Sequence, residues 1–183
     1  MKGSSVRVRA SASLTAMTEP GEEIQIRAAQ PDDVELLLAL IQELADYEKL
    51  AHKAKGEADA LRRSLFEEEV GEALIIEVDG EPVGHAIFFP TLSSFECRPG
   101  IWLEDVFVRP QYRRRGIGGA VMEYLASLAI ERDYVRLEWC ALDWNEPALR
   151  FYDGLGATRL DDWTMLRLEG DGLRQLARRR LKG

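Results

Sequence analysis

The sequence predicts a mixed α/β domain, because short runs with the period-2 alternation of strands are interspersed with longer runs at helical spacing. Asp79-Gly80 is a strong hairpin signal between two of these short runs. Strand–helix–strand crossovers are confined to the second half of the chain. The 183 residues, 46% of them hydrophobic and 31% charged, are typical of one soluble globular domain.

The first helix is predicted to begin at Pro31, which fits the first helical position, and Asp32 and Asp33 complement the positive end of the helix dipole. Its apolar residues recur at i, i+3, i+4 and i+7, and they are Val34, Leu37, Leu38, Ile41, Leu44 and Ala45. The expected elements around it are, in chain order, a strand at 24–26, a second helix at 58–67, strands at 73–78 and 83–89, a loop at 90–100 and a strand at 101–108.

The second half of the chain continues this alternation. Gly156 is expected to end the helix that precedes it, because glycine adopts the left-handed conformation of a C-terminal cap. The expected elements are a helix at 116–132, a strand at 135–141, a helix at 146–155, a strand at 163–168 and a basic helix at 173–181. We therefore expect a disordered extension at 1–23, a folded domain at 24–170 and a basic C-terminal helix or tail at 171–183.

Composition excludes several classes of function. The net charge of −8 argues against nucleic-acid binding and suits a cationic small molecule. No apolar run reaches the roughly 20 residues of a membrane helix, so no membrane partner is expected. Cys97 and Cys140 form no CxxC pair, which argues against a metal site and fits buried thiols in the cytoplasm. His85, on an apolar strand, is expected to be a hydrogen-bonded core residue.

The segment LEDVFVRPQYRRRGIGGAVMEYL, residues 103–125, predicts an anion site. A strand ends before Pro110, and a basic, glycine-containing turn opens directly into an amphipathic helix. The first N–H groups of a helix have no internal partner, and Gly116, Gly118 and Gly119 let a phosphate approach the backbone closely. A Gly-Lys-Ser/Thr phosphate loop is absent, and Val121 stands where a dinucleotide fingerprint needs glycine.

The segment LEWCALDWNEPALRFYDGLGA, residues 137–157, predicts a second helix with a defined start. Asn145 is suited to cap this helix, and Pro147 lies in its first turn. The apolar stripe of the helix includes Tyr152, which is expected to point towards the interior or a cleft.

Together, the motifs LIQELADYEKL, WLEDVFVRPQYRRRGIGG and DWNEPALRFYDGLGA resemble the GNAT acetyltransferases. Within that superfamily the chain resembles the spermidine/spermine acetyltransferases and their diamine and thialysine relatives, over residues 24–170. The resemblance implies a mostly antiparallel central sheet, splayed between strands 101–108 and 135–141, with helices on both faces. It also implies a homodimer.

The resemblance implies acetyl-CoA as cosubstrate and assigns a role to each matching residue. Val106, Phe107 and Val108 would pair with the pantetheine arm, and Arg113, Arg114, Arg115, Gly116, Ile117, Gly118 and Gly119 would hold the diphosphate. Asn145, Glu146, Pro147 and Ala148 would contact the coenzyme near its reactive end. Tyr152 would lie near the thioester sulfur as the general acid.

Acetyl transfer needs a neutral amine, so the site should hold carboxylates that bind the ammonium ion and remove its proton. Strand alternation places Glu104 on the side of Trp102 and Val106, and the resemblance places it at the substrate amine as general base. Asp105 is expected to point the other way, in a structural role. Tyr47 and Glu48 match the amine-binding pair, and Glu48 also lies near a helix C-terminus, where an anion needs a cationic partner.

The substrate is therefore expected to be a diamine, a polyamine or a lysine-like amino acid. Of the loop residues 93–96, only Glu96 could replace a further acidic contact of the polyamine enzymes, which leaves a shorter amine at least as plausible. Two alternatives stay open: a non-catalytic acyl-CoA-binding sensor, and a protein lysine acetyltransferase. No metal is required.

Overall fold

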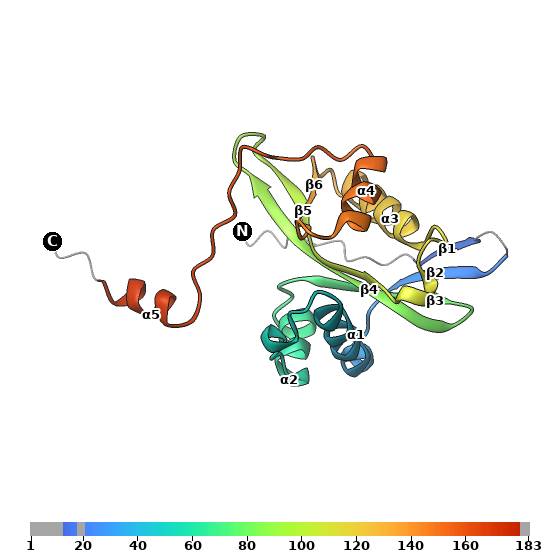
Figure 1. Ribbon diagram of the computed structural model, residues 1–183, viewed down its shortest axis with the longest axis horizontal. Helices are drawn as coiled ribbons and strands as arrows, with labels where there is room; N and C mark the ends of the chain where they lie inside the picture. The colour runs from blue at the N-terminus through green and yellow to red at the C-terminus, as the bar shows by residue number, and fades with distance from the viewer. Residues whose placement is uncertain (1–12, 18–20, 180–183) are drawn as a thin grey trace, which may run out of the picture. The chain divides into compact units, whose positions relative to one another are not determined.

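The computed structural model describes residues 13–17 and 21–179. One six-stranded sheet dominates it, with the strands in the order β1-β2-β3-β4-β5-β6 (Figure 1). The strands are β1 (Leu14–Met17), β2 (Glu23–Ala28), β3 (Glu72–Val78), β4 (Glu81–Ser93), β5 (Arg98–Val108) and β6 (Leu137–Trp139). All neighbours pair antiparallel except β5 and β6, which are parallel. The prediction of a mixed α/β fold with a mostly antiparallel sheet is therefore confirmed.

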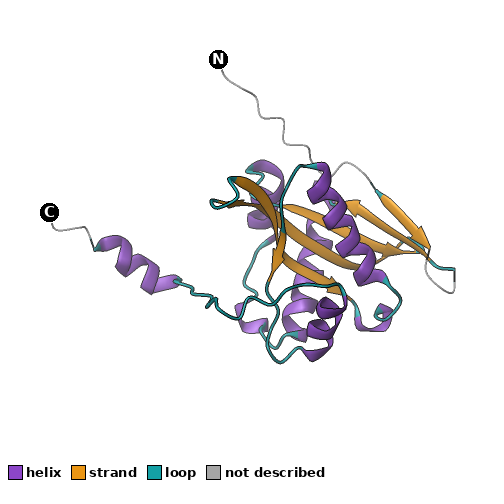
Figure 2. Cartoon of the chain, turned by 90° about the horizontal axis from the view of Figure 1, so that it is seen from above, coloured by secondary structure: helices purple, strands orange, loops and turns teal. Residues whose placement is uncertain are grey.

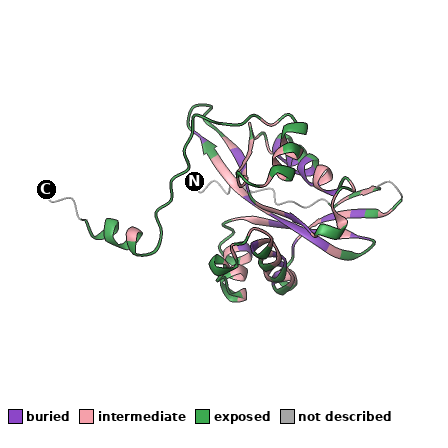
Figure 3. Ribbon diagram, viewed as in Figure 1, coloured by how far each residue is buried: buried purple, intermediate pink, exposed green. Residues whose placement is uncertain are grey.

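The chain divides into two compact units, Met1–Cys140 and Ala141–Gly183. In the first unit, α1 (Val34–Tyr47) and α2 (Ala58–Arg62) cover one face of the sheet and α3 (Ile117–Glu131) covers the other (Figures 1 and 2). The second unit contains α4 (Glu146–Gly154) and α5 (Gly170–Arg178). Buried residues are concentrated in the central strands and along α1 and α3 (Figure 3).

Helix α1 begins as the sequence predicts. Pro31–Asp33 form a single 3-10 turn that leads into the helix. The Asp33 carboxylate accepts a hydrogen bond from the backbone N–H of Gln30 at 2.7 Å and forms an ion pair with Arg27 at 2.7 Å. This pairing lowers the pKa of Asp33. The helix start is thus fastened to β2, and the far end of α1 is held over the sheet.

The hairpin between β3 and β4 forms at Asp79-Gly80, where both residues have positive φ angles of 50° and 79°. Both residues of the turn therefore lie in the left-handed region that this hairpin requires. Further along β4, Gly84 lies against β5 so closely that a Cβ atom would be 2.2 Å from the carbonyl oxygen of Phe107. Only glycine fits there.

The expected loop at 90–100 is wrong. Strand β4 continues to Ser93, β5 begins at Arg98, and these two residues pair, so only a short turn remains between them. Pro90, Pro99 and Gly100 suggested a loop, yet all three lie within the paired strands. At the far end of a two-stranded extension, a residue without an N–H group costs little pairing.

One expectation near the beginning of the chain also needs correction. Residues 14–17, expected to be disordered, form β1, which pairs with Ile24, Ile26 and their neighbours in β2. The strand was missed because its surroundings in the sequence are small and polar, and only two of its residues, Leu14 and Ala16, are partly buried. The predictions for residues 1–12, 18–20 and 180–183 fall outside the described residues.

In the second unit, residues 163–168 form no strand, although their sequence is strand-like. Trp163 and Leu166 are exposed, with 75% and 87% of their surfaces accessible. The basic helix α5 does form, close to its predicted position. Strand β6 is three residues long, shorter than the expected 135–141.

Candidate active site

The turn between β5 and α3 has the geometry of an anion site. Gly116 caps α3 in a left-handed conformation with φ of 80°, and Arg114 has a φ of 63°. A Cβ atom on Gly116 or Gly119 would meet no other atom within 4 Å. The first backbone N–H groups of the helix therefore border open space, where a phosphate can approach them.

The three arginines of this turn have different environments. Arg113 folds back on its own strand: its Nε donates to the Val108 carbonyl oxygen at 2.8 Å, and its guanidinium carbon lies 4.1 Å from the centre of the Tyr47 ring. Arg115 forms an ion pair with Glu22 at 2.7 Å. Arg114 is exposed. Of the three arginines, Arg114 is thus the one most available to a diphosphate.

Strand β5 leaves half of one edge open. Its parallel pairing with β6 covers only Ile101–Leu103, whereas β4 pairs with β5 as far as Val108. Among the described residues, no strand lies beside the stretch 106–108 on the β6 side. The predicted splay between the two strands is therefore present, and backbone groups of Val106, Phe107 and Val108 have no strand beside them on this side within the described residues.

A bulge in β5 changes the positions of the carboxylates. Asp105 pairs with Ile87 and Leu103 pairs with Phe88, so Glu104 is an extra residue in β5. A bulge sets two residues opposite one, and alternation fails across it. Asp105 consequently lies opposite Ile87, which packs into the apolar cluster beneath α1 and α2.

The expectation that Asp105 points away from the site is therefore wrong. Burial, together with the neighbouring charges of Glu104 and Glu48, raises the pKa of Asp105 to about 6. Burial also raises the pKa of Glu48, which caps the C-terminal end of α1. Asp105, in the middle of β5, thus lies close enough to Glu104 and to Glu48, at the end of α1, for their charges to act on it, and these three carboxylates are called the acidic cluster below.

Glu104 differs from Asp105 in its surroundings. It is exposed, and its carboxylate accepts a hydrogen bond from the Trp102 indole N–H at 2.8 Å. This contact confirms that Trp102 and Glu104 share one side of β5. Val106 lies beyond the bulge, where it pairs with the buried Ala86, so the expectation that it shares this side is wrong.

Helix α4 has the predicted start and end. The Asn145 side chain accepts a hydrogen bond from the backbone N–H of Ala148 at 3.4 Å, and Glu146 and Pro147 form the first turn. Gly156 follows the helix with a φ of 81°. Tyr152 is half-buried, with its ring 5.1 Å from that of Phe151.

His85 is buried, as expected, but the hydrogen bond expected for it is absent. Neither of its ring nitrogens has a hydrogen-bond partner, and burial lowers the pKa of the imidazole to about 4. Cys97 and Cys140 are exposed, so the prediction of buried thiols is wrong. Within the described ranges, no group of three or more His, Cys, Asp or Glu side chains is arranged to hold a metal ion.

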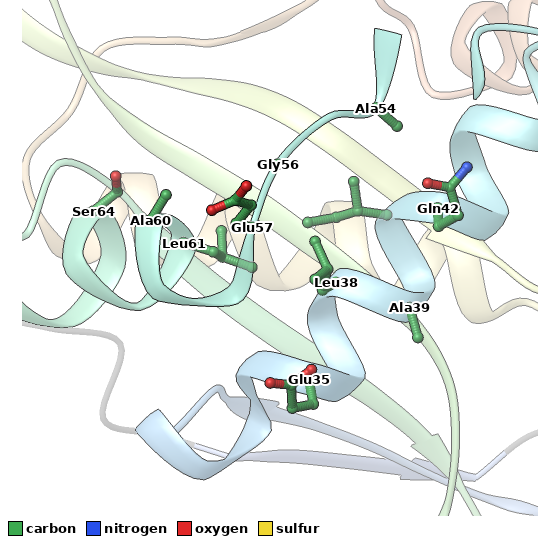
Figure 4. A pocket seen from close by; sticks show the side chains of 11 residues that line it. Glu35, Leu38, Ala39, Gln42, Ala54, Gly56, Glu57, Ala60, Leu61 and Ser64 are labelled. Carbon is green, nitrogen blue, oxygen red and sulfur yellow. The ribbon is translucent and has the colours of Figure 1, made fainter. Parts of the chain in front are cut away.

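A groove of about 600 Å³ lies between α1 and α2, away from these residues (Figure 4). Leu38, Ile41 and Leu61 provide much of its apolar lining, with Glu35 and Glu57 among its polar residues. None of the predicted site residues borders it. Leu38 and Ile41 belong to the predicted apolar stripe of α1, so this stripe faces the groove as well as the sheet.

Comparison with known proteins agrees with this geometry. Residues 37–157 match the acetyltransferase (GNAT) family. The thialysine N-epsilon-acetyltransferase of Bos taurus is 36% identical over 166 residues, covering 84% of this chain and 97% of the relative. The L-ornithine N5-acetyltransferase of Arabidopsis thaliana is 27% identical and covers 83% of this chain and 87% of the relative.

Among solved structures, an integron cassette protein from the mobile metagenome of V. cholerae superposes with a TM-score of 0.72 at 26% identity. It covers 85% of this chain and 98% of its own. Among the described residues, no helix is both long and apolar enough to cross a membrane. The chain belongs to the GNAT acetyltransferase family and is an N-acetyltransferase that resembles the thialysine and spermidine/spermine enzymes.

Proposed function

We propose that the protein transfers an acetyl group from acetyl-CoA directly to a primary amine of a small cationic substrate: a diamine, a polyamine or a lysine-like amino acid. The main support for this proposal is that one strand, β5, has both an open backbone edge at 106–108 and the acidic cluster. The similarity to a thialysine and an L-ornithine acetyltransferase favours an amino acid with an amine at the end of its side chain.

Acetyl-CoA would bind along β5 and the turn that follows it. The open backbone groups of Val106, Phe107 and Val108 support pairing with the amides of the pantetheine arm. The N–H groups from Arg114 to Gly119 support binding of the diphosphate, with the exposed Arg114 side chain as its cationic partner. Arg113 would instead hold this turn against Tyr47. Asn145 to Ala148, at the start of α4, would contact the coenzyme near its thioester.

The amine must lose a proton before it attacks the thioester carbonyl. A free alkylammonium ion has a pKa near 10.4 and is almost fully protonated at neutral pH. The acidic cluster offers charge to bind this cation and a base to deprotonate it. Attack on the carbonyl carbon forms the new C–N bond, and the C–S bond then breaks. The departing thiolate would take its proton from the Tyr152 hydroxyl.

We assign the proton transfer from the amine to Asp105, with Glu104 and Glu48 binding the cation beside Tyr47. A general base works best when its pKa lies near the working pH. The pKa of Asp105, about 6, meets this condition. The hydrogen bond from the Trp102 indole N–H, at 2.8 Å, holds the Glu104 carboxylate in one orientation, which supports its role in binding the cation.

A thiol-release assay over a panel of diamines, polyamines, lysine, thialysine and ornithine tests this function. We expect release of CoA with at least one of these amines. Tyr152→Phe and Asp105→Asn should each lower kcat by about 100-fold or more, because general acid–base catalysis contributes 10²–10⁴-fold. Glu104→Gln should mainly raise KM for the amine.

Acetyl-CoA binding, measured by calorimetry on the same variants, is the control. Tyr152→Phe should bind acetyl-CoA like the wild type, so a loss of turnover reports on chemistry. Binding of acetyl-CoA without thiol release for any amine would favour the sensor alternative. Release with a protein lysine alone would favour the protein acetyltransferase. We further propose that the enzyme is a cytoplasmic homodimer, as its resemblance to the subfamily implies.

A further inference from the structure

The guanidinium group of Arg113 has hydrogen-bond donors that the chain does not use. A guanidinium carries five N–H donors, and Arg113 gives one of them, on Nε, to the Val108 carbonyl oxygen at 2.8 Å. Within residues 13–17 and 21–179, no group accepts a hydrogen bond from its Nη1 or Nη2. The side chain is half-buried, so the other four donors are partly withdrawn from water. A cation in this condition favours an anionic ligand.

The neighbouring arginines are already committed to partners. Arg109 donates from Nε and Nη2 to the Glu43 carboxylate at 2.9 and 2.7 Å, and its Nη1 donates to a carbonyl oxygen. Arg115 donates from Nη1 to Glu22 at 2.7 Å, and its Nη2 also donates to a carbonyl oxygen. The third arginine of the turn is exposed and serves the diphosphate. Arg113 is therefore the arginine of this region that remains for a second anion.

Arg113 also lies beside the proposed amine site. Its guanidinium carbon is 4.1 Å from the centre of the Tyr47 ring and 5.8 Å from that of Phe107. Phe107 lies two residues beyond Asp105 in β5, after the bulge, so their side chains share one face of the strand. Two residues of a strand span about 7 Å. This distance is comparable with the length of an extended lysine side chain.

The charges of the site decide which substrates need such a cation. The acidic cluster attracts amines, but it repels any substrate that also carries a carboxylate. A guanidinium removes this repulsion, because it offers two parallel N–H groups to a carboxylate. A diamine has no group for this cation to bind, and its second ammonium ion is repelled by it. The guanidinium therefore discriminates between an amino acid and the diamine that lacks only the carboxylate.

We propose that Arg113 binds the α-carboxylate of a lysine-like amino acid and makes it the preferred substrate over the matching diamine. Glu48, which follows Tyr47, binds the α-ammonium group, and the side-chain amine reaches Asp105. Nε and the face of the guanidinium still hold the turn, while Nη1 and Nη2 bind the substrate. This inference rests on the proposed acetyl transfer and names the substrate class of that site.

Matched pairs of substrates test this assignment in a thiol-release assay. L-lysine and 1,5-diaminopentane differ only in the carboxylate, as do L-ornithine and 1,4-diaminobutane. We expect kcat/KM of the wild type to be about 10-fold or more higher for each amino acid, as for a hydrogen bond between charged groups. L-lysinamide, which has both amines but a neutral amide, should fall to the level of 1,5-diaminopentane.

The variant Arg113→Met tests the residue itself. It should lower kcat/KM for L-lysine by about 10-fold or more, mainly through KM, and for 1,5-diaminopentane by less than about threefold. Arg113→Lys keeps the charge but loses the planar pair of donors, so its loss should be intermediate. Arg63→Met is the matched control, because Arg63 forms an exposed ion pair with Glu68 at 3.5 Å. This control changes the net charge equally and should leave both rates unchanged.

Equal kcat/KM for the two members of each pair in the wild type would overturn the proposal. So would an equal loss for L-lysine and 1,5-diaminopentane in Arg113→Met with weaker acetyl-CoA binding by calorimetry, which would assign Arg113 to the coenzyme. If Arg113→Met does not fold, the comparison with L-lysinamide on the wild type decides. Failure of the proposed function looks different, because no amine would then release thiol. Calorimetric titration of L-lysine and 1,5-diaminopentane into the protein with CoA would still compare the pair, and equal dissociation constants would overturn the proposal.

Discussion

The substitution His85→Leu tests whether the buried, unpaired imidazole of His85 lowers the stability of the fold. The imidazole lies on β4 with no accessible surface and with both nitrogens lacking a hydrogen-bond partner. Its ring centre lies 6.1 Å from that of Phe107. Leucine has a similar volume and no polar atoms, so the substitution should remove a desolvation cost without leaving a cavity. At pH 7.5 we expect a gain of about 1–3 kcal/mol in the free energy of unfolding.

The pH dependence of this effect has a definite sign. Burial lowers the pKa of His85 from 6.5 to about 4, with Glu43 acting weakly in the opposite direction. Between these two values the unfolded chain binds a proton that the folded chain does not, so stability falls as the pH drops from about 6.5 towards 4. The two pKa values imply a loss of about 2 kcal/mol between pH 7 and pH 5 from this residue alone.

Urea unfolding of wild type and His85→Leu at a series of pH values measures the difference. The wild type should lose about 2 kcal/mol more than the variant between pH 7 and pH 5. The comparison cancels the titration of Asp105 and the other carboxylates, which both proteins share. His52→Leu is the control, because His52 is exposed. Equal pH slopes in wild type and His85→Leu would refute a neutral, unpaired imidazole in the fold.

Three further predictions concern the sheet and the site. Gly84→Ala should destabilise the fold by about 3 kcal/mol or more, measured by thermal melting, because the new Cβ would lie 2.2 Å from the Phe107 carbonyl oxygen. Turnover of the wild type should fall as the pH drops through about 6, the pKa of Asp105, and a thiol-release pH profile of Asp105→Asn should lack this limb. Glu72→Gln should cost about 3 kcal/mol in urea unfolding, because it removes the bidentate partner, at 2.6 and 2.7 Å, of the largely buried Arg132; an unchanged midpoint would contradict this estimate.

The parts of the fold that depend on local chemistry could be predicted from the sequence. Asp79-Gly80 determines its own turn, Asn145 caps its own helix, and Gly116 supplies the left-handed residue before α3. Each needs information from only a few neighbouring residues. The turn before α3 is such a feature, because Gly116 alone provides the left-handed residue at which the helix starts.

The features that were missed depend on partners distant in the sequence. The bulge at Glu104 arises from the register between β4 and β5, and no local pattern marks the extra residue. Strict alternation therefore placed Asp105 on the wrong side and hid a strong candidate for the base. The strand at 14–17 forms because β2 is beside it, and the prolines at 90 and 99 do not break a strand whose partner is fixed elsewhere.

The stacking of Arg113 on Tyr47 predicts how these two positions vary among related proteins. The Arg113 guanidinium lies 4.1 Å from the centre of the Tyr47 ring and donates a hydrogen bond to the Val108 carbonyl oxygen. An aromatic ring at position 47 therefore gains this cation–π contact only while arginine occupies position 113. The two positions lie 66 residues apart, and they belong to different parts of the proposed site: Tyr47 to the amine site and Arg113 to the turn before α3. Replacement of either residue nevertheless removes the stacking contact of the other. The two positions should therefore vary together among relatives: those that lack the arginine at position 113 should also lack the aromatic residue at position 47.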